Sequence, residues 1–250
     1  MLEQAKGRMN MKTRVSVSNK AHVPTIVCVN NATVPLGVDF SDLVAAMQVF
    51  VDDHVAPVWG TRAKLVKAKD LKPGKWAMVF VDHADHARAL ARHDLTPDGL
   101  PMARVFVKTT LANNNLISVA ATHELVEMLV DPAINIVTMR KGSNLVYQYE
   151  SADPVEDLHF PVNGIPMTNF VYPTYFEEFH KPGSVKFDHL GALSEPFQIH
   201  AGGYQGVLKD GKWIPIHGSV EKKRRFERED RRGRRSEQRA AKSRHHSSKT

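Results

Sequence analysis

Residues 116–130 constrain the fold more than any other part of the chain. They are mostly apolar and long enough for a helix, and Asp131-Pro132 ends the run, because proline cannot continue a helix. A helix with so much apolar surface is stable only when other elements cover it. We therefore expect a helix here that packs against a sheet in a layered fold.

The segments before this helix predict the rest of the layer. A helix is expected from Ser41 or Asp39 to Val55, where Pro57 and Gly60 would end it. The polar segment 82–99 is expected to be an excursion with at most a short helix. Apolar and alternating runs predict strands at residues 24–30, 63–68, 76–81 and 102–107. A sheet with helices against it is an α+β fold.

The C-terminal half divides into a β-hairpin region and a basic tail. Residues 196–216 predict a hairpin region around a Lys209-Asp210-Gly211 turn. Beyond residue 218 few apolar residues remain, so we expect a disordered or marginally helical tail over 218–250. A flexible leader is expected over 1–22, which leaves 23–217 as the folded domain.

Charge and cysteine content limit the partners and the compartment. The net charge of +7 comes from residues 221–250, which carry 13 basic and 5 acidic residues, while the remainder is close to neutral. Nucleic acid or another polyanion could therefore bind at the tail alone. The alternative is a solvated, charged tail without such a partner. No apolar run predicts a membrane helix or a secretory signal. Cys28 is the single cysteine and lies in an apolar run, which favours a buried thiol and a cytoplasmic location.

The central helix carries residues suited to metal chemistry. His123 and Glu127 are one helical turn apart and can bind one ion from a single face. Glu124 points about 100° away, where it can hold a water that the ion also binds. This is the pattern of the His-Glu-x-x-His helix of zinc peptidases, with glutamate in place of the second histidine. The alternative is a helix whose His-Glu pair is exposed or only hydrogen-bonded.

A zinc site on two helical ligands needs a third ligand from elsewhere. The acidic segment that follows the helix offers Glu150 or Asp153, and the sequence does not choose between them. The alternative is an acidic loop with a capping aspartate. A second candidate cluster is Asp82-His83-Ala84-Asp85-His86 with His93 nearby, although a polar surface loop explains it equally well.

Over residues 24–217 the chain resembles a family of uncharacterised bacterial and phage proteins with a zincin-like metallopeptidase signature. The motifs that carry the resemblance are Ala56-Pro57-Val58-Trp59-Gly60, residues 122–132 with His123, Glu124 and Glu127, residues 150–156 with Glu150 and Asp153, residues 162–173 and Gly202-Gly203-Tyr204. The resemblance implies a zincin-like mixed sheet with the motif helix packed against it. It also allows a place in a phage virion. Because Glu127 replaces the histidine of most zincins, the identity of the metal is left open.

These residues together predict a metal-dependent hydrolase. One divalent ion, expected to be zinc, would polarise a carbonyl and acidify a water, and Glu124 would accept the proton. Tyr172 or Tyr175 would hydrogen-bond the developing oxyanion, and a peptide or protein would be the substrate. Two alternatives stay open: a non-catalytic, phage-associated protein on the same scaffold, and a nucleic-acid-associated protein that uses its tail.

Overall fold

The computed structural model describes residues 23–84 and 90–228. A five-stranded mixed sheet forms one layer, with strand order β2-β1-β3-β5-β4. Four strands run parallel, and β4 pairs antiparallel with β5 at the edge. The strands are β1 (Thr25–Asn30), β2 (Lys64–Ala68), β3 (Trp76–Val81), β4 (Ala91–Leu95) and β5 (Pro101–Phe106). The fold is α+β, as predicted.

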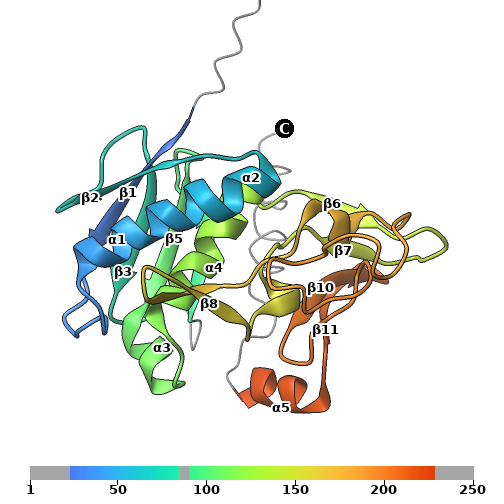
Figure 1. Cartoon of the computed structure of the whole chain (residues 1–250). Coiled ribbons are helices and arrows are strands. Elements are labelled where there is room, and N and C mark those ends of the chain that lie inside the picture. Colours follow the sequence, from blue (N-terminus) through green and yellow to red (C-terminus); the bar gives the residue numbers. More distant parts are fainter. Residues whose placement is uncertain (1–22, 85–89, 229–250) are drawn as a thin grey trace, which may run out of the picture.

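Two long helices cover one face of this sheet, and three shorter helical segments continue or precede them (Figure 1). Asp39 caps the first of them by accepting hydrogen bonds from the backbone of Ser41 and Asp42, and Gly60 ends the third with a φ of 70°. They are α1 (Phe40–Val49), a π-helical segment η1 (Phe50–Val55), α2 (Ala56–Trp59), α3 (Val107–Ala112) and α4 (Ile117–Val130). Within the described residues, no helix has both the length and the apolar character needed to cross a bilayer.

The alternation of side chains along β1 shows how the sheet divides the interior. Ile26 and Cys28 face α1 and α4 in the main core, whereas Val27 and Val29 belong to a smaller cluster on the opposite face. Cys28 is fully buried, and this burial raises the pKa of its thiol to about 12. The predicted buried thiol is confirmed.

The chain after α4 forms two smaller sheets. One is antiparallel with order β11-β10-β7-β6, and the other is the hairpin β8-β9. The elements are β6 (Val137–Met139), β7 (Val146–Gln148), η2 (Asp153–Val155), β8 (His159–Val162), β9 (Ile165–Thr168), η3 (Pro173–Phe176), β10 (Tyr204–Lys209) and β11 (Lys212–His217). The hairpin predicted around Asp210 is confirmed. Residues 197–200 form no strand, because Phe197 has a φ of 58° and packs its ring against Tyr147.

One prediction about the first layer is wrong. Segment 82–99 was expected to be a polar excursion with at most a short helix, but residues 91–95 form the edge strand β4. The segment has no run of apolar residues, and only the middle residue of the strand, His93, is fully buried. The usual sequence signal of a buried strand is therefore missing. Hydrogen bonding to β5 and packing against α4 hold the strand in place.

The basic tail is partly folded. Residues 220–228 form α5 (Val220–Arg228), which agrees with the marginally helical alternative for this part of the tail and not with the disordered one. The ammonium group of Lys222 is buried and donates to Glu156 and Asp157. Phe226 packs against the rings of Tyr204 and His217. These two anchors stabilise a helix with almost no apolar content of its own. The predicted leader 1–22 and the rest of the tail, 229–250, lie outside the described residues.

Candidate metal site

Helix α4 carries three of the candidate side chains into the interior. His123, Glu124 and Glu127 are 7%, 3% and 0% exposed. Thr122, the residue before His123, is tied to β9, because the backbone N–H of Thr168 donates to Thr122 Oγ1 at 2.9 Å. Leu125, Met128 and other apolar residues of α4 belong to the main core. The helix is therefore held on several sides and keeps its polar groups in fixed positions.

His123 and Glu127 face the same point, as their spacing predicts. The Nε2 atom of His123 lies 3.2 Å from Glu127 Oε1. It also lies 3.1 Å from Asp153 Oδ1, and the carboxylate of Asp153 is fully buried. The Oε1 atom of Glu127 accepts a hydrogen bond from the backbone N–H of Ala152 at 3.3 Å. Residues from α4 and from η2, about 30 positions apart, thus meet in one group.

This first group has the dimensions of a metal site. Its three ligand atoms, one each from His123, Glu127 and Asp153, lie within 4.8 Å of one another. In a tetrahedral zinc site, with bonds of about 2.0–2.2 Å, neighbouring ligand atoms are about 3.4 Å apart. The distances from His123 Nε2 to Glu127 Oε1 and to Asp153 Oδ1 are close to that value. Buried carboxylates are normally paired or metal-bound, and this group permits both.

The two acids of the 150s segment have different positions. Asp153 is the first residue of η2, and its carboxylate contacts the imidazole of His123. Glu150 is also fully buried, but it belongs to neither three-residue group of metal-ligand type among the described residues. The short 3-10 turn explains the difference, because it includes Asp153 and begins after Glu150. The geometry favours Asp153 as the third ligand.

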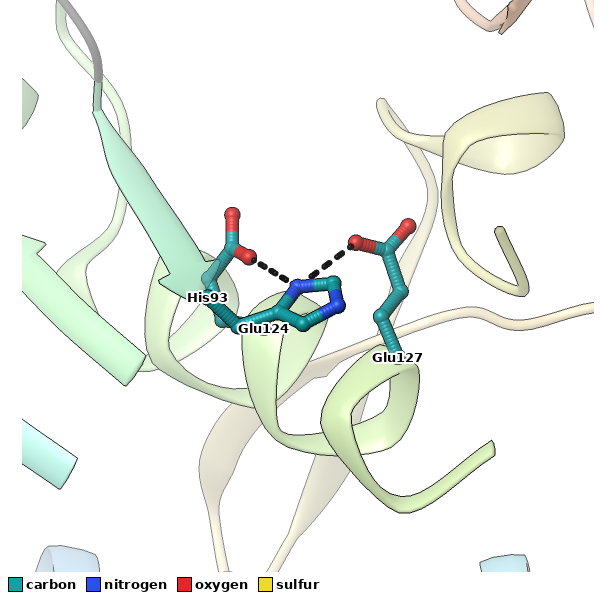
Figure 2. Close-up of side chains that lie close together, drawn as sticks. All are labelled: His93, Glu124 and Glu127. Carbon is teal, nitrogen blue, oxygen red and sulfur yellow. Dashed lines mark hydrogen bonds and ion pairs between the residues drawn. The ribbon is translucent and has the colours of Figure 1, made fainter. Parts of the chain in front are cut away.

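A second group of ligand atoms lies beside the first and contains His93 (Figure 2). The Nδ1 atom of His93 is 2.9 Å from Glu124 Oε2 and 3.7 Å from Glu127 Oε2. The histidine is 1% exposed and comes from β4. The sequence pattern indicated His93 only as a neighbour of the Asp82 cluster. Its place in a short alternating segment before a Thr-Pro-Asp-Gly turn was the available signal for an edge strand.

Electrostatics at the first group favour the protonated imidazole when no ion is present. Burial lowers the pKa of His123, but the charges and hydrogen bonds of Glu127 and Asp153, with a smaller contribution from Glu124, outweigh it. The pKa of His123 is therefore held well above the ordinary histidine value. A cation that bound here would replace this proton, so the metal affinity of such a site rises with pH.

Tyr172, predicted to stabilise an oxyanion, takes part in a different cluster. Its hydroxyl lies 3.1 Å from His189 Nδ1, and His189 Nε2 lies 3.0 Å from His54 Nδ1. The three side chains pack among Phe50, Phe160 and Phe170. Burial, followed by the charges of His54 and Lys186, lowers the pKa of His189 to about 4. Tyr175, the other predicted candidate, is buried and donates to Gln205 Oε1.

The Asp82 cluster does not form a metal site in the described residues. Asp82 accepts hydrogen bonds from the backbone and hydroxyl of Thr33, and it pairs with Lys108. These bonds from Thr33 hold the pKa of Asp82 well below its usual range. His83 is exposed. Asp85 and His86 lie outside the described residues.

Comparison with known proteins gives no family assignment. No protein-family model, no curated protein and no solved structure matches this chain.

Proposed function

We propose that this protein is a metal-dependent hydrolase of the zincin type, with peptides as its substrate class. The observation that carries the proposal is that His123 Nε2, on a buried helix, lies 3.2 Å from Glu127 Oε1 and 3.1 Å from Asp153 Oδ1. One imidazole and two carboxylates form a harder ligand set than two imidazoles and one carboxylate. This set suits zinc and is also compatible with manganese or iron.

The neighbouring residues supply the proton chemistry. A divalent cation in this group would act as a Lewis acid, polarising a carbonyl and acidifying water. Glu124 follows His123 on α4, so its carboxylate can accept a proton from the attacking water and pass it to the leaving amine. His93 lies 2.9 Å from Glu124 Oε2 and holds this carboxylate in one orientation.

The sheet supports a peptide as the substrate class. Among the described strands β4 has one neighbour, β5, and its other side is an edge. An extended peptide can pair with such an edge through backbone hydrogen bonds. His93, in the middle of β4, contacts Glu124, so a peptide paired with this edge would run beside the catalytic group.

The test combines metal content and cleavage. The zinc-loaded protein is incubated with a peptide library made from a digested proteome, and new termini are identified by mass spectrometry. We expect cleavage that a chelator abolishes and zinc restores. Glu124→Gln should keep the ion bound at His123 and Asp153 and lose activity by about 10²–10⁴-fold. Glu195→Gln, at an exposed position, is the matched control and should behave as the wild type.

A structural ion is the second candidate, and the burial of the ligands favours it. Glu127 and Asp153 are fully buried, and His123 is 7% exposed. For a structural ion we expect the chelator to lower the melting temperature while no peptide is cut. That pair of results would contradict the catalytic proposal and leave the structural one. Cleavage that is equal in wild type and Glu124→Gln would instead remove Glu124 from the mechanism.

Polyanion binding by residues 221–250 stays a prediction. In the described part of this segment, Lys222 and Arg225 already pair with Glu156 and Asp157. Truncation after residue 220 should abolish retention on heparin at low salt if the tail carries the interaction. Unchanged retention would contradict it.

A further inference from the structure

We propose that Glu127 bridges two divalent cations, and that His93, Glu124 and Glu127 form the second site. This inference rests on the proposed function, which supplies the first cation at His123, Glu127 and Asp153. The two groups of ligand atoms share one residue, Glu127, and each spans less than 4.8 Å.

The two oxygens of Glu127 are directed to different imidazoles. Oε1 lies 3.2 Å from His123 Nε2, and Oε2 lies 3.7 Å from His93 Nδ1 (Figure 2). A carboxylate can bind two cations at once, one through each oxygen, in two-metal sites with ions about 3.5–4 Å apart. The backbone N–H of Ala152 donates to Oε1 and fixes the plane of this carboxylate.

The second group is built as tightly as the first. His93, Glu124 and Glu127 are 1%, 3% and 0% exposed, and they come from a strand and a helix that pack together. Two carboxylates, from Glu124 and Glu127, approach the same ring nitrogen at 2.9 and 3.7 Å. A single N–H can be directed fully at only one of them. A cation beside Nδ1 contacts all three groups at once.

The glutamate at position 127 has a specific consequence. An imidazole at this position would offer one nitrogen to the first cation, and its other nitrogen would point away from it across the ring. A carboxylate presents a second oxygen at short range, so the His-Glu-x-x-Glu pattern permits a bridge. When the second cation is bound, Glu124 is a ligand and cannot accept a proton. We therefore expect excess zinc to inhibit cleavage.

Metal stoichiometry tests this proposal without a substrate. Metal-free protein is titrated with Zn²⁺ or Mn²⁺, and bound ions are counted by native mass spectrometry. The Mn²⁺ form is also studied by electron paramagnetic resonance. We expect two ions and a spin-coupled spectrum for the wild type. His93→Ala should bind one ion and give an isolated-ion spectrum. Glu127→His should also bind one, because it keeps a first ligand and loses the bridge.

His83→Ala is the matched control, because His83 is an exposed histidine on the segment before β4. It should bind two ions. One ion in the wild type, unchanged in His93→Ala, would overturn the bridge and leave the first site intact. Two ions in all variants would place the second ion elsewhere and also overturn it. No ion in the wild type would overturn the proposed function itself. Glu127→His keeps the test valid if His93→Ala fails to fold.

Discussion

His93 Nδ1, on the edge strand β4, lies 2.9 Å from Glu124 Oε2, on helix α4. The two residues are 31 positions apart, and both are almost completely buried. This contact ties the edge of the sheet to the helix that carries His123 and Glu127. The four side chains that α4 and β4 contribute to the proposed site are therefore supported by regular elements, which fix geometry better than loops do.

The first prediction concerns the third ligand. Asp153→Asn removes the charge that lies 3.1 Å from His123 Nε2 and should weaken zinc binding by at least about 100-fold. Glu150→Gln should leave zinc affinity within a few-fold of the wild type, because Glu150 lies outside both groups. Zinc affinity is measured by competition with a chromophoric chelator.

Asp98→Asn is the control for this pair, since Asp98 is exposed in the turn after β4. This substitution also removes one negative charge, but Asp98 belongs to neither group of ligand atoms. It should therefore leave the zinc affinity unchanged. Weaker binding in Glu150→Gln than in Asp153→Asn would reverse our assignment of the third ligand.

The second prediction concerns pH and the cluster of Tyr172, His189 and His54. The pKa of His189 is lowered to about 4 in the folded state, mainly by burial, whereas an unfolded histidine has a pKa of about 6.5. Between these values the unfolded chain binds a proton that the folded chain does not. Stability is therefore lost as the pH falls from about 6.5 to about 4. We expect this contribution to be about 1 kcal/mol, because His189 is only partly buried and solvent screens its charge.

Urea unfolding at pH 7.5 and 4.5 measures this contribution. His189→Gln should lose less stability than the wild type between the two pH values. His159→Gln, at an exposed position, should lose as much as the wild type. The same pH sensitivity in all three proteins would show that His189 does not carry this effect.

The third prediction concerns the attachment of α5. Lys222→Ala leaves the largely buried carboxylate of Glu156 without its ammonium partner. We expect a loss of about 2 kcal/mol, below the 3–5 kcal/mol of fully buried pairs because Asp157 is partly exposed. For a domain of this size the melting temperature should fall by about 4–8 °C.

Lys223→Ala makes the same change of charge one residue later, at an exposed position of α5. It should change the melting temperature by less than about 2 °C. Equal losses in the two variants would mean that α5 contributes through its overall charge and not through the buried pair.

The sequence predicts the elements whose signal is local. The periodicity and the stop at Pro132 predict α4 to within one residue, and the cap at Asp39 predicts the start of α1. The end of the first predicted helix differs, because residues 50–55 form the π-helical segment η1. The i, i+4 spacing places His123 and Glu127 on one face, which the structure bears out at 3.2 Å. The choice between Glu150 and Asp153 depends on where a single turn begins, and that is decided by tertiary packing.

Two features have only weak signals in the sequence, for the same physical reason. Strand β4 has one fully buried side chain, His93, and α5 depends on Lys222 and Phe226. Each element is held by residues distant in the chain. His93 contacts Glu124, Lys222 pairs with Glu156, and Phe226 packs against Tyr204. Propensity and periodicity measure neighbours along the sequence, so they do not detect elements held by contacts of this kind.

The most direct test of the central claim is anomalous X-ray scattering from crystals of the protein grown with zinc. We expect an anomalous peak at the zinc edge within about 2.0–2.2 Å of His123 Nε2, Glu127 Oε1 and Asp153 Oδ1. Zinc-grown crystals in which these three atoms surround no peak, while His123 still contacts Asp153 directly, would contradict the metal site and the function built on it.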